Sequence, residues 1–287
     1  MPRIRKVVIP AAGWGTRFLP TTKAVPKEIL PLVDRPIIHY GVEEAVASGI
    51  TQVIVITSPG KTAIQYYFEP NPELERFLEE KGKTDLLRDI RRLSSLAEMR
   101  YVIQEEQLGL GHAILTAAEA VGQEPFAVLL PDDIIQNQTP VLEQMMELYQ
   151  RYQASIVAVE RVGKDQISDY GIVEPEEESR GVYRVKSLVE KPKIEEAPSD
   201  LGIVGRYIFT PAIFDALKIT KPGALGEIQV TDGMANLLSN EPLYAYQFRG
   251  KRHDAGTPLG MIKASIEMAF EREDMGAEIR QYLTDAK

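Results

Sequence analysis

Residues 7–31 read VVIPAAGWGTRFLPTTKAVPKEILP, and this stretch decides how the rest of the chain is interpreted. The β-branched run 7–9 is typical of a strand that is buried on both faces, and Pro10 ends its regular pairing. The residues that follow are small: Ala11, Ala12, Gly13 and Gly15. Such a backbone can approach a ligand closely and turn its N–H groups toward an anion. Positive charge is added by Arg17, Lys23 and Lys27. The stretch therefore predicts a polyphosphate site at the carboxyl end of the first strand.

Two better-known phosphate motifs do not fit the sequence. The third glycine of the dinucleotide fingerprint is replaced by Phe18, and Asp34 lies inside a proline-flanked turn rather than at the end of a second strand. Gly-Lys-Thr triplets begin at Gly60 and Gly82, but both lack the earlier glycine that a P-loop requires. We therefore interpret both triplets as unrelated to phosphate binding.

The overall composition narrows the class of protein. The 287 residues are 44% hydrophobic, so the chain can bury a large core as one domain or two. A net charge of -9 argues against general nucleic-acid binding. Cysteine is absent, and neither a signal peptide nor an apolar run of membrane-spanning length is found, so we expect a cytoplasmic chain.

The order of the elements predicts an α/β fold. A helix is expected from Pro36 to the residues before Gly49, followed by a buried strand over 52–57. This order of strand, loop, helix and strand predicts a right-handed crossover and a parallel sheet with ligands at its carboxyl edge. Residues 61–96 are charged and periodic, so we expect an amphipathic helical insert packed on the edge of the sheet.

The motif Ala-Ala-Gly-x-Gly-Thr-Arg at 11–17, followed by Pro-Lys-Glu-x-Leu-Pro at 26–31, resembles the signature of sugar-1-phosphate nucleotidyltransferases. The whole chain is similar to the bacterial glucose-1-phosphate uridylyltransferases. The resemblance implies a Rossmann-like, three-layer α/β fold with a mixed, mostly parallel central sheet and a smaller β-rich sugar-binding region. It also implies Mg²⁺-dependent transfer of uridylyl from UTP to α-D-glucose 1-phosphate, giving UDP-glucose and pyrophosphate.

Other functions stay open at this point. Within the class, the nucleotide can be dTTP, or the sugar phosphate can be a different one. In another class, the chain can be a non-catalytic regulator that binds a nucleotide sugar. We expect one domain over residues 1–287, with 1–135 mainly binding the nucleotide and 136–256 mainly binding the sugar phosphate. The C-terminal helices, 257–287, either seal the core or form a subunit contact in a homodimer or homotetramer.

The resemblance assigns the nucleotide to the first loop and to a later strand end. The loop residues are Ala11, Ala12, Gly13, Gly15 and Thr16. Gln104 ends an expected strand over 100–104, and its amide can both donate to and accept from a base edge. The resemblance implies that Gln104, Gly109 and Gly111 read the uracil. Neighbouring residues depart from the family pattern, so Gln107 is an alternative base reader.

Two acids follow the apolar strand expected over 126–130. An unpaired carboxylate there is costly, and Mg²⁺ is a natural partner for it. The resemblance places the metal on Asp132 and on Asp254, whereas Asp133 is interpreted as the N-cap of a turn. We interpret His253 as a neighbour of this site rather than as a ligand.

The sugar phosphate is assigned to the second half of the chain. Gly171 and Gly205 lie in strand-like runs, where glycine suggests close approach of a ligand or another backbone. Glu190 and Lys191 can bind sugar hydroxyls and the sugar phosphate, although an isolated Glu-Lys pair is usually a solvated surface pair. Gly226-Glu-Ile-Gln-Val-Thr-Asp232 resembles the family motif beside the sugar pocket, or is only the start of a helix.

The implied chemistry gives the cations their roles. The attacking phosphate oxygen is already ionised, so the task is to position two polyanions and to stabilise the charge of the transition state. We assign Arg17 and Lys27 to the triphosphate and the transition state, and Lys23 is a lesser candidate. The role of Trp14 in the first loop is unexplained.

Overall fold

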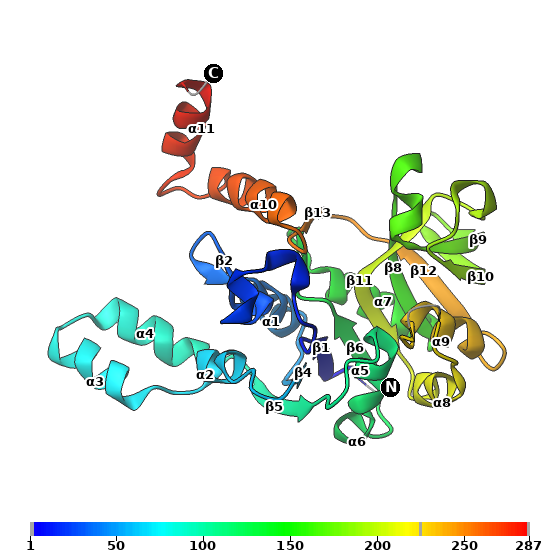
Figure 1. Cartoon of the computed structure of the whole chain (residues 1–287), viewed down its shortest axis with the longest axis horizontal. Coiled ribbons are helices and arrows are strands. Elements are labelled where there is room, and N and C mark those ends of the chain that lie inside the picture. Colours follow the sequence, from blue (N-terminus) through cyan, green and yellow to red (C-terminus); the bar gives the residue numbers. More distant parts are fainter. Residues whose placement is uncertain (1–2, 224–225, 286–287) are drawn as a thin grey trace.

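The computed structural model describes residues 3–223 and 226–285, and its centre is a nine-stranded sheet (Figure 1). In spatial order its strands are β5 (Glu98–Ile103), β4 (Gln52–Thr57), β1 (Lys6–Pro10), β6 (Phe126–Leu129), β11 (Leu201–Phe209), β8 (Ser155–Arg161), β12 (Leu243–Gln247), β10 (Val182–Glu190) and β9 (Gly171–Ser179). The strands β5, β4, β1 and β6 are parallel neighbours, as are β8 and β12. Only β11 and β10 run against the other strands of this sheet. The expectation of a mixed, mostly parallel sheet is confirmed.

Helices cover both faces of the sheet. Those that pack on it are α1 (Ile37–Ala47), α2 (Ala63–Phe68), α5 (Leu110–Thr116), α6 (Ala118–Val121), α7 (Val141–Tyr152), α8 (Ala212–Ile219) and α9 (Val230–Leu237). The other helices are α3 (Pro72–Glu80), α4 (Thr84–Leu93), α10 (Pro258–Phe270) and α11 (Gly276–Asp285). Alternate residues of β1 enter different cores: Val8 packs with α5, α6, α8 and α9, whereas Val7 and Ile9 pack with α1, α2 and α7. This period of two produces the three layers.

Two short strand pairs lie beside the main sheet. The pair β2 (Pro31–Leu32) and β3 (Arg35–Pro36) follows the first loop. The pair β7 (Asp133–Gln136) and β13 (Lys251–Asp254) joins segments far apart in the chain, with Asp254 opposite Asp133. This register brings the two acidic motifs of the sequence to one place.

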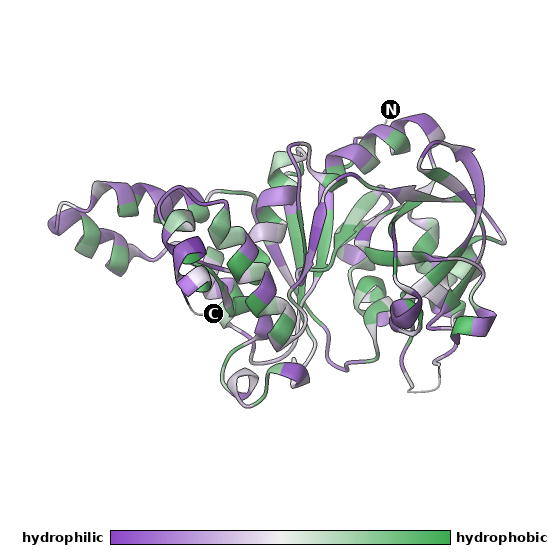
Figure 2. Cartoon of the chain, turned by 90° about the horizontal axis from the view of Figure 1, so that it is seen from above, coloured by the Kyte–Doolittle hydropathy of each residue, from purple (hydrophilic) through white to green (hydrophobic). Residues whose placement is uncertain are grey.

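The helical insert differs from the expectation. The hairpin of α3 and α4 extends away from the sheet (Figures 1 and 2). Only Leu78 and Leu87 of its apolar stripe are buried, whereas Phe77 and Leu86 are 53% and 55% exposed. Packing on the sheet holds for α2 and for the end of α4, where Leu93 contacts the core, but it is wrong for the rest of the hairpin.

The C-terminal helices contact the body through a small part of their surface. Ala264 of α10 is buried in a cluster with Leu32 and Ile37. Leu259 and Ile262 of the same helix are 62% and 58% exposed. Sealing the core is therefore not the main role of this helix. Among the described residues, none of the helices combines the length and apolar character needed to cross a membrane.

Candidate active site

A pocket of about 630 Å³ opens beside the carboxyl ends of β1, β5 and β6. Eight of the predicted residues line it: Ala12, Gly13, Gly15, Thr16, Lys27, Gln104, Gly109 and Asp132. Both candidate base readers are in the wall, because Gln107 lines the pocket with Gln104. Trp14 also lines it and is 72% exposed. The strand ends of the parallel half of the sheet thus bring the predicted nucleotide residues together.

The first loop has the backbone of an anion site. Gly15 has a φ of +63°, and a Cβ there would lie 3.1 Å from Lys27 Cβ and 3.1 Å from Thr22 Cγ2, so glycine is required. Within the described part of the chain, no N–H group from Ala12 to Gly15 donates a backbone–backbone hydrogen bond. These donors are available to a ligand at the pocket wall.

Ala11, however, is excluded from this group. It is 1% exposed, its N–H donates to Ile56 O at 2.7 Å, and its carbonyl accepts from Lys61 Nζ at 3.0 Å. Both backbone polar groups of Ala11 are thus used within the protein, and its predicted contact with the nucleotide stays a prediction.

Lys27 and Asp132 form an ion pair in the pocket. The Nζ of Lys27 lies 2.6 Å from Oδ2 of Asp132, and each side chain is 23% exposed. Burial lowers the pKa of Lys27, but the Asp132 and Glu28 carboxylates outweigh it and hold the pKa above its usual value. Burial raises the pKa of Asp132, but Lys27 outweighs it and keeps that pKa below its usual value. Both groups therefore stay charged at neutral pH.

Asp132 and Asp254 face a common space beside Gly256. A Cβ on Gly256 would lie 3.0 Å from Asp132 Oδ2 and 3.0 Å from Asp254 Oδ1, so only glycine leaves this space open. The guanidinium of Arg17 reaches Gly256 O from Nη1 at 3.5 Å. Over 3–223 and 226–285, no cluster of three or more His, Cys, Asp or Glu side chains is placed to hold a metal. Carboxylate oxygens are ligands that Mg²⁺ prefers.

Asp133 has a different role from the predicted N-cap. It is the first residue of β7, and its Oδ2 accepts from Gly205 N–H at 2.8 Å while its Oδ1 accepts from Arg252 Nε at 2.6 Å. The N-cap interpretation is wrong, because this buried carboxylate is the first residue of β7 and binds Gly205 and Arg252.

Gly205 is explained by the same contact. A Cβ on Gly205 would lie 2.6 Å from Asp133 Oδ2 and 2.6 Å from Leu130 Cβ. Its N–H donates to Asp133, and its carbonyl accepts from Leu130 N–H at 2.9 Å. Glycine at this position permits close packing of β11 on the acidic turn (Asp132–Asp133). The predicted contact of Gly205 with the sugar phosphate stays a prediction.

The residues predicted to bind the base, Gln104, Gly109 and Gly111, differ in their surroundings. Gln104 is 3% exposed, and its Nε2 lies 2.8 Å from Nδ1 of His112. Gly109, with a φ of +95°, lines the pocket. Gly111 donates its N–H to Ile228 O at 2.8 Å, and a Cβ there would lie 2.7 Å from the same oxygen. Glycine at 111 is needed for packing against Ile228, and its predicted contact with the base stays a prediction.

The other residues predicted to bind the sugar phosphate, Gly171, Glu190 and Lys191, lie close to one another and do not line this pocket. Gly171 is paired with Glu190 between β9 and β10, and the Glu190 carboxylate lies 3.1 Å from where a Gly171 Cβ would be. Lys191 has a φ of +44°, and its Nζ lies 3.9 Å from Glu190. The Lys191 side chain is 57% exposed, so its ammonium can move to a ligand.

Arg252 was not singled out in the sequence. It lies on β13 and connects this strand to Asp133, Glu160 and Tyr170. Its guanidinium contacts Asp133 at 2.6 Å, Glu160 at 2.6 Å and the Tyr170 hydroxyl at 3.0 Å. Burial lowers the pKa of Arg252, but these partners, led by Asp133, raise it by more. The next residue, His253, contacts Glu267 and Gln136 instead of Asp254, in agreement with its interpretation as a neighbour.

Lys61 and Glu28 were also missed. Lys61 belongs to a Gly-Lys-Thr triplet that was set aside because it does not form a P-loop, yet its ammonium contacts the first loop at Ala11 O and Gly13 O. Glu28 lines the nucleotide pocket and is 1% exposed. Burial raises the pKa of Glu28 against the opposing charges of Lys61 and Lys27.

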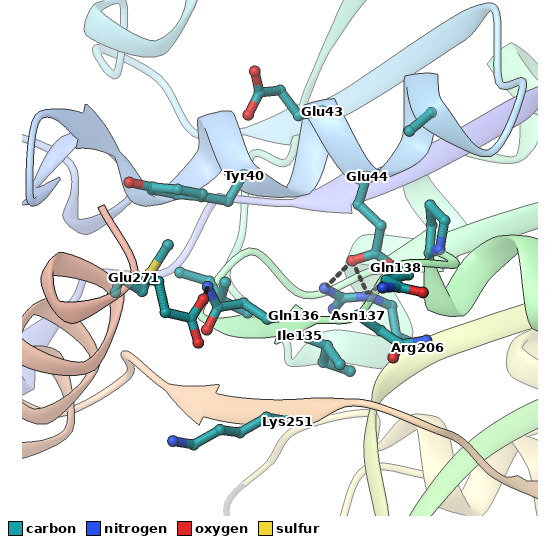
Figure 3. Close-up of a pocket in the computed structure, with 14 residues that line it drawn as sticks. Tyr40, Glu43, Glu44, Ile135, Gln136, Asn137, Gln138, Arg206, Lys251 and Glu271 are labelled. Atoms are coloured by element: carbon teal, nitrogen blue, oxygen red, sulfur yellow. Dashed lines mark hydrogen bonds and ion pairs between the residues drawn. The ribbon is translucent and has the colours of Figure 1, made fainter. Parts of the chain in front are cut away.

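A second pocket, of about 760 Å³, lies between α1, β7 and α10 (Figure 3). None of the predicted site residues lines it. Its most buried polar contact is the ion pair of Glu44 and Arg206, in which Nη2 lies 2.7 Å from Oε2. Arg206 is 1% exposed and also donates to Asp133 O at 2.6 Å. Through Arg206, this pocket adjoins the acidic turn (Asp132–Asp133) of the candidate site.

Comparison with known proteins agrees with this geometry. The family model described as "Nucleotidyl transferase" matches residues 6–270. The chain is 50% identical over 281 residues to UTP–glucose-1-phosphate uridylyltransferase 1 of Staphylococcus saprophyticus, covering 98% of each chain. It is 47% identical over 283 residues to the UTP–glucose-1-phosphate uridylyltransferase of Bacillus subtilis, covering 99% of this chain and 97% of that one. The solved structure of UTP-bound UGPase from Acinetobacter baumannii is 39% identical, with a TM-score of 0.92 over 99% of this chain and 100% of that one. The chain therefore belongs to the nucleotidyl transferase family and, within it, to the UTP–glucose-1-phosphate uridylyltransferases.

Proposed function

We propose that this protein transfers uridylyl from UTP to α-D-glucose 1-phosphate, giving UDP-glucose and pyrophosphate. The observation that carries the proposal is the single pocket that holds Lys27, Asp132, Gln104 and the free N–H groups of the first loop. These groups fit a triphosphate at one end and a base edge at the other. The relatives with this activity in their names are similar over nearly the whole chain.

The residues act by positioning and by fixed charge. A phosphate oxygen of the sugar phosphate attacks the α-phosphorus in line, and pyrophosphate leaves. That oxygen is ionised at neutral pH, so the step requires no general base. We assign Arg17 and Lys27 to the triphosphate and to the negative charge of the transition state. Their cations converge near Asp132, with Lys27 at 2.6 Å from it and Arg17 close to Gly256.

We assign Mg²⁺ to Asp132 and Asp254, whose carboxylates face the space left open by Gly256. When bound, the ion neutralises phosphate charge and orients the phosphates for displacement. Two carboxylates suffice in such a site, because substrate phosphates and water supply the other ligands of Mg²⁺. The side chains of this chain supply the anchoring charges, and Arg252 holds the neighbouring Asp133 in place.

The two substrates divide the chain. Residues 1–135 hold the nucleotide, with Gln104 and Gly109 at the uracil and Gln107 as the alternative reader. Residues 136–256 hold the sugar phosphate, through Gly171, Glu190 and Lys191. The third part, 257–287, contains the C-terminal helices α10 and α11, which extend from the body. The division into halves of one domain is supported by the continuous sheet, which contains strands of both halves.

A coupled assay of pyrophosphate release tests the activity. With UTP, glucose 1-phosphate and Mg²⁺ we expect rapid release, and removal of Mg²⁺ with a chelator is expected to abolish it. A panel with dTTP, CTP and other sugar 1-phosphates identifies the preferred pair. Binding of UDP-glucose without any turnover in Mg²⁺ would instead indicate a non-catalytic regulator.

Replacing Lys191 with alanine is expected to raise KM for glucose 1-phosphate by on the order of tenfold or more, with KM for UTP nearly unchanged. The reason is that its exposed ammonium can reach the sugar phosphate but lies outside the nucleotide pocket. Initial-rate kinetics with each substrate varied in turn measure both constants. Unchanged kcat and unchanged KM for glucose 1-phosphate would remove Lys191 from this role.

We further propose that the protein is a cytoplasmic homodimer or homotetramer. The cytoplasmic location is supported by the absence of cysteine. Self-association is supported by apolar side chains exposed on projecting helices: Phe77, Leu86, Leu259 and Ile262. Sedimentation velocity at micromolar concentration distinguishes these states, and a monomer alone would contradict the proposal.

A further inference from the structure

Lys61 is placed against the first loop from a neighbouring strand end. It follows β4 and precedes α2, and its side chain is 15% exposed. The ammonium reaches three oxygens: Ala11 O at 3.0 Å, Gly13 O, and Glu28 Oε2 at 3.5 Å. A lysine ammonium has three N–H donors and no acceptor. Two of them bind the carbonyls of Ala11 and Gly13, and the Glu28 carboxylate adds an ion pair.

These contacts set the direction of the loop amides. In a trans peptide, the carbonyl of one residue and the N–H of the next point in opposite directions. Because the carbonyls of Ala11 and Gly13 face Lys61, the N–H groups of Ala12 and Trp14 are turned away from it. Ala12 and Trp14 line the nucleotide pocket, and neither N–H donates a backbone–backbone hydrogen bond within the described residues.

We propose that Lys61 is a positioning residue that holds the loop from Ala11 to Trp14 with its N–H groups presented to the triphosphate. The inference rests on the proposed function for the identity of the ligand, a nucleoside triphosphate. Lys61 does not line the pocket itself, so it acts through the loop rather than on the substrate.

Glu28 forms an ion pair with the Lys61 ammonium. It is 1% exposed, and neither carboxylate oxygen has a hydrogen-bond partner among the described residues. A buried charge is costly unless an opposite charge compensates it, and Lys61 Nζ at 3.5 Å provides that compensation. Glu28 therefore keeps the ammonium at the loop. The neighbouring residue, Lys27, pairs with Asp132. Two adjacent residues thus hold two groups: Glu28 holds Lys61 at the first loop, and Lys27 holds Asp132.

The test compares Lys61→Met with Lys61→Arg and with the matched surface variant Lys218→Met. Lys218 is an exposed lysine on α8 that pairs with Asp215 and is not among the residues that line the pocket. For Lys61→Met we expect UTP to bind on the order of 10- to 100-fold more weakly, because two carbonyls and one carboxylate lose a charged donor. KM for glucose 1-phosphate is expected to stay within about twofold. Lys61→Arg is expected to recover part of the UTP affinity, and Lys218→Met to match the wild type.

Binding of UTP without turnover is measured by calorimetry and by the emission of Trp14, the only tryptophan of the chain, which lines the pocket. Wild-type UTP affinity in folded Lys61→Met overturns the proposal. So does an equal rise in both KM values, which indicates general damage. If Lys61→Met does not fold, Glu28→Gln decides: weaker UTP binding supports the proposal and unchanged binding overturns it. A wild type that binds UTP without making UDP-glucose refutes the proposed function alone, since the Lys61 comparison is then made on binding.

Discussion

Replacing Lys27 with methionine is expected to lower kcat, at saturating UTP and glucose 1-phosphate, by on the order of 100-fold or more. Its ammonium lies in the pocket at 2.6 Å from Asp132, and the pKa shifts keep both groups charged. A fixed cation here stabilises charge that develops on the phosphates, and methionine fills the space without that charge. Steady-state pyrophosphate release with both substrates saturating measures the loss.

The control for this prediction is Lys218→Met, which removes an exposed cation that is paired only on α8. It is expected to leave kcat unchanged. A second comparison, Lys23→Met, asks whether positive charge anywhere in the first loop is enough. If Lys27→Met retains kcat within tenfold of the wild type, Lys27 does not act in the transition state and the assignment fails.

Replacing Arg206 with methionine is expected to lower the free energy of unfolding by about 3–5 kcal/mol, because one partner of a buried ion pair is removed. Arg206 is 1% exposed and pairs with Glu44 at 2.7 Å. It also donates to Leu130 O at 3.2 Å and to Asp133 O at 2.6 Å, so its loss leaves several buried acceptors without donors. Urea denaturation followed by circular dichroism measures the change.

A matched double variant separates the ion pair from the side-chain volume. Glu44→Leu together with Arg206→Met removes both charges, and it is expected to recover a large part of the lost stability. Lys218→Met, at an exposed ion pair, is expected to change the free energy of unfolding by less than about 0.5 kcal/mol. If Arg206→Met costs less than about 1 kcal/mol, the desolvated pair does not contribute as described.

The fold could be predicted from the sequence where the local pattern carries the answer. The strand over 52–57 has the predicted bounds, and the motif at 26–31 places Lys27 in the phosphate pocket. Asp132 was also placed correctly in that pocket. In each case a short stretch holds both the structural signal and the chemical group.

Three of the predicted ligand residues also have a role in packing that the sequence did not reveal. Gly111 and Gly205 are glycines because residue 228 and Asp133 pack against them, and these partners are distant in the chain. A glycine in a strand or at a helix start signals close approach, but the sequence does not say whether a ligand or another segment approaches. The carbonyl of Ala11 accepts from Lys61, which comes from another strand end.

The exposed hairpin of α3 and α4 shows that the sequence also does not identify the partner of a helix face. The apolar stripe of α3 and α4 has the period of a helix that packs on the sheet, yet Phe77 and Leu86 are exposed. Periodicity identifies the apolar face of a helix, but it does not identify what covers that face. Lys61 was missed for a related reason, because its triplet was compared only with a motif in which the lysine binds phosphate directly.

The ion pair between Asp133 and Arg252 has a consequence for folding during protein synthesis. The two residues are 119 positions apart, so a ribosome that adds roughly 5–20 residues per second completes Asp133 on the order of ten seconds before its partner exists. Until then, burying the Asp133 carboxylate lacks the guanidinium that compensates it. A nascent chain that ends before residue 252 therefore lacks the guanidinium that compensates the Asp133 carboxylate, and the acidic turn takes its final form only when β13 arrives.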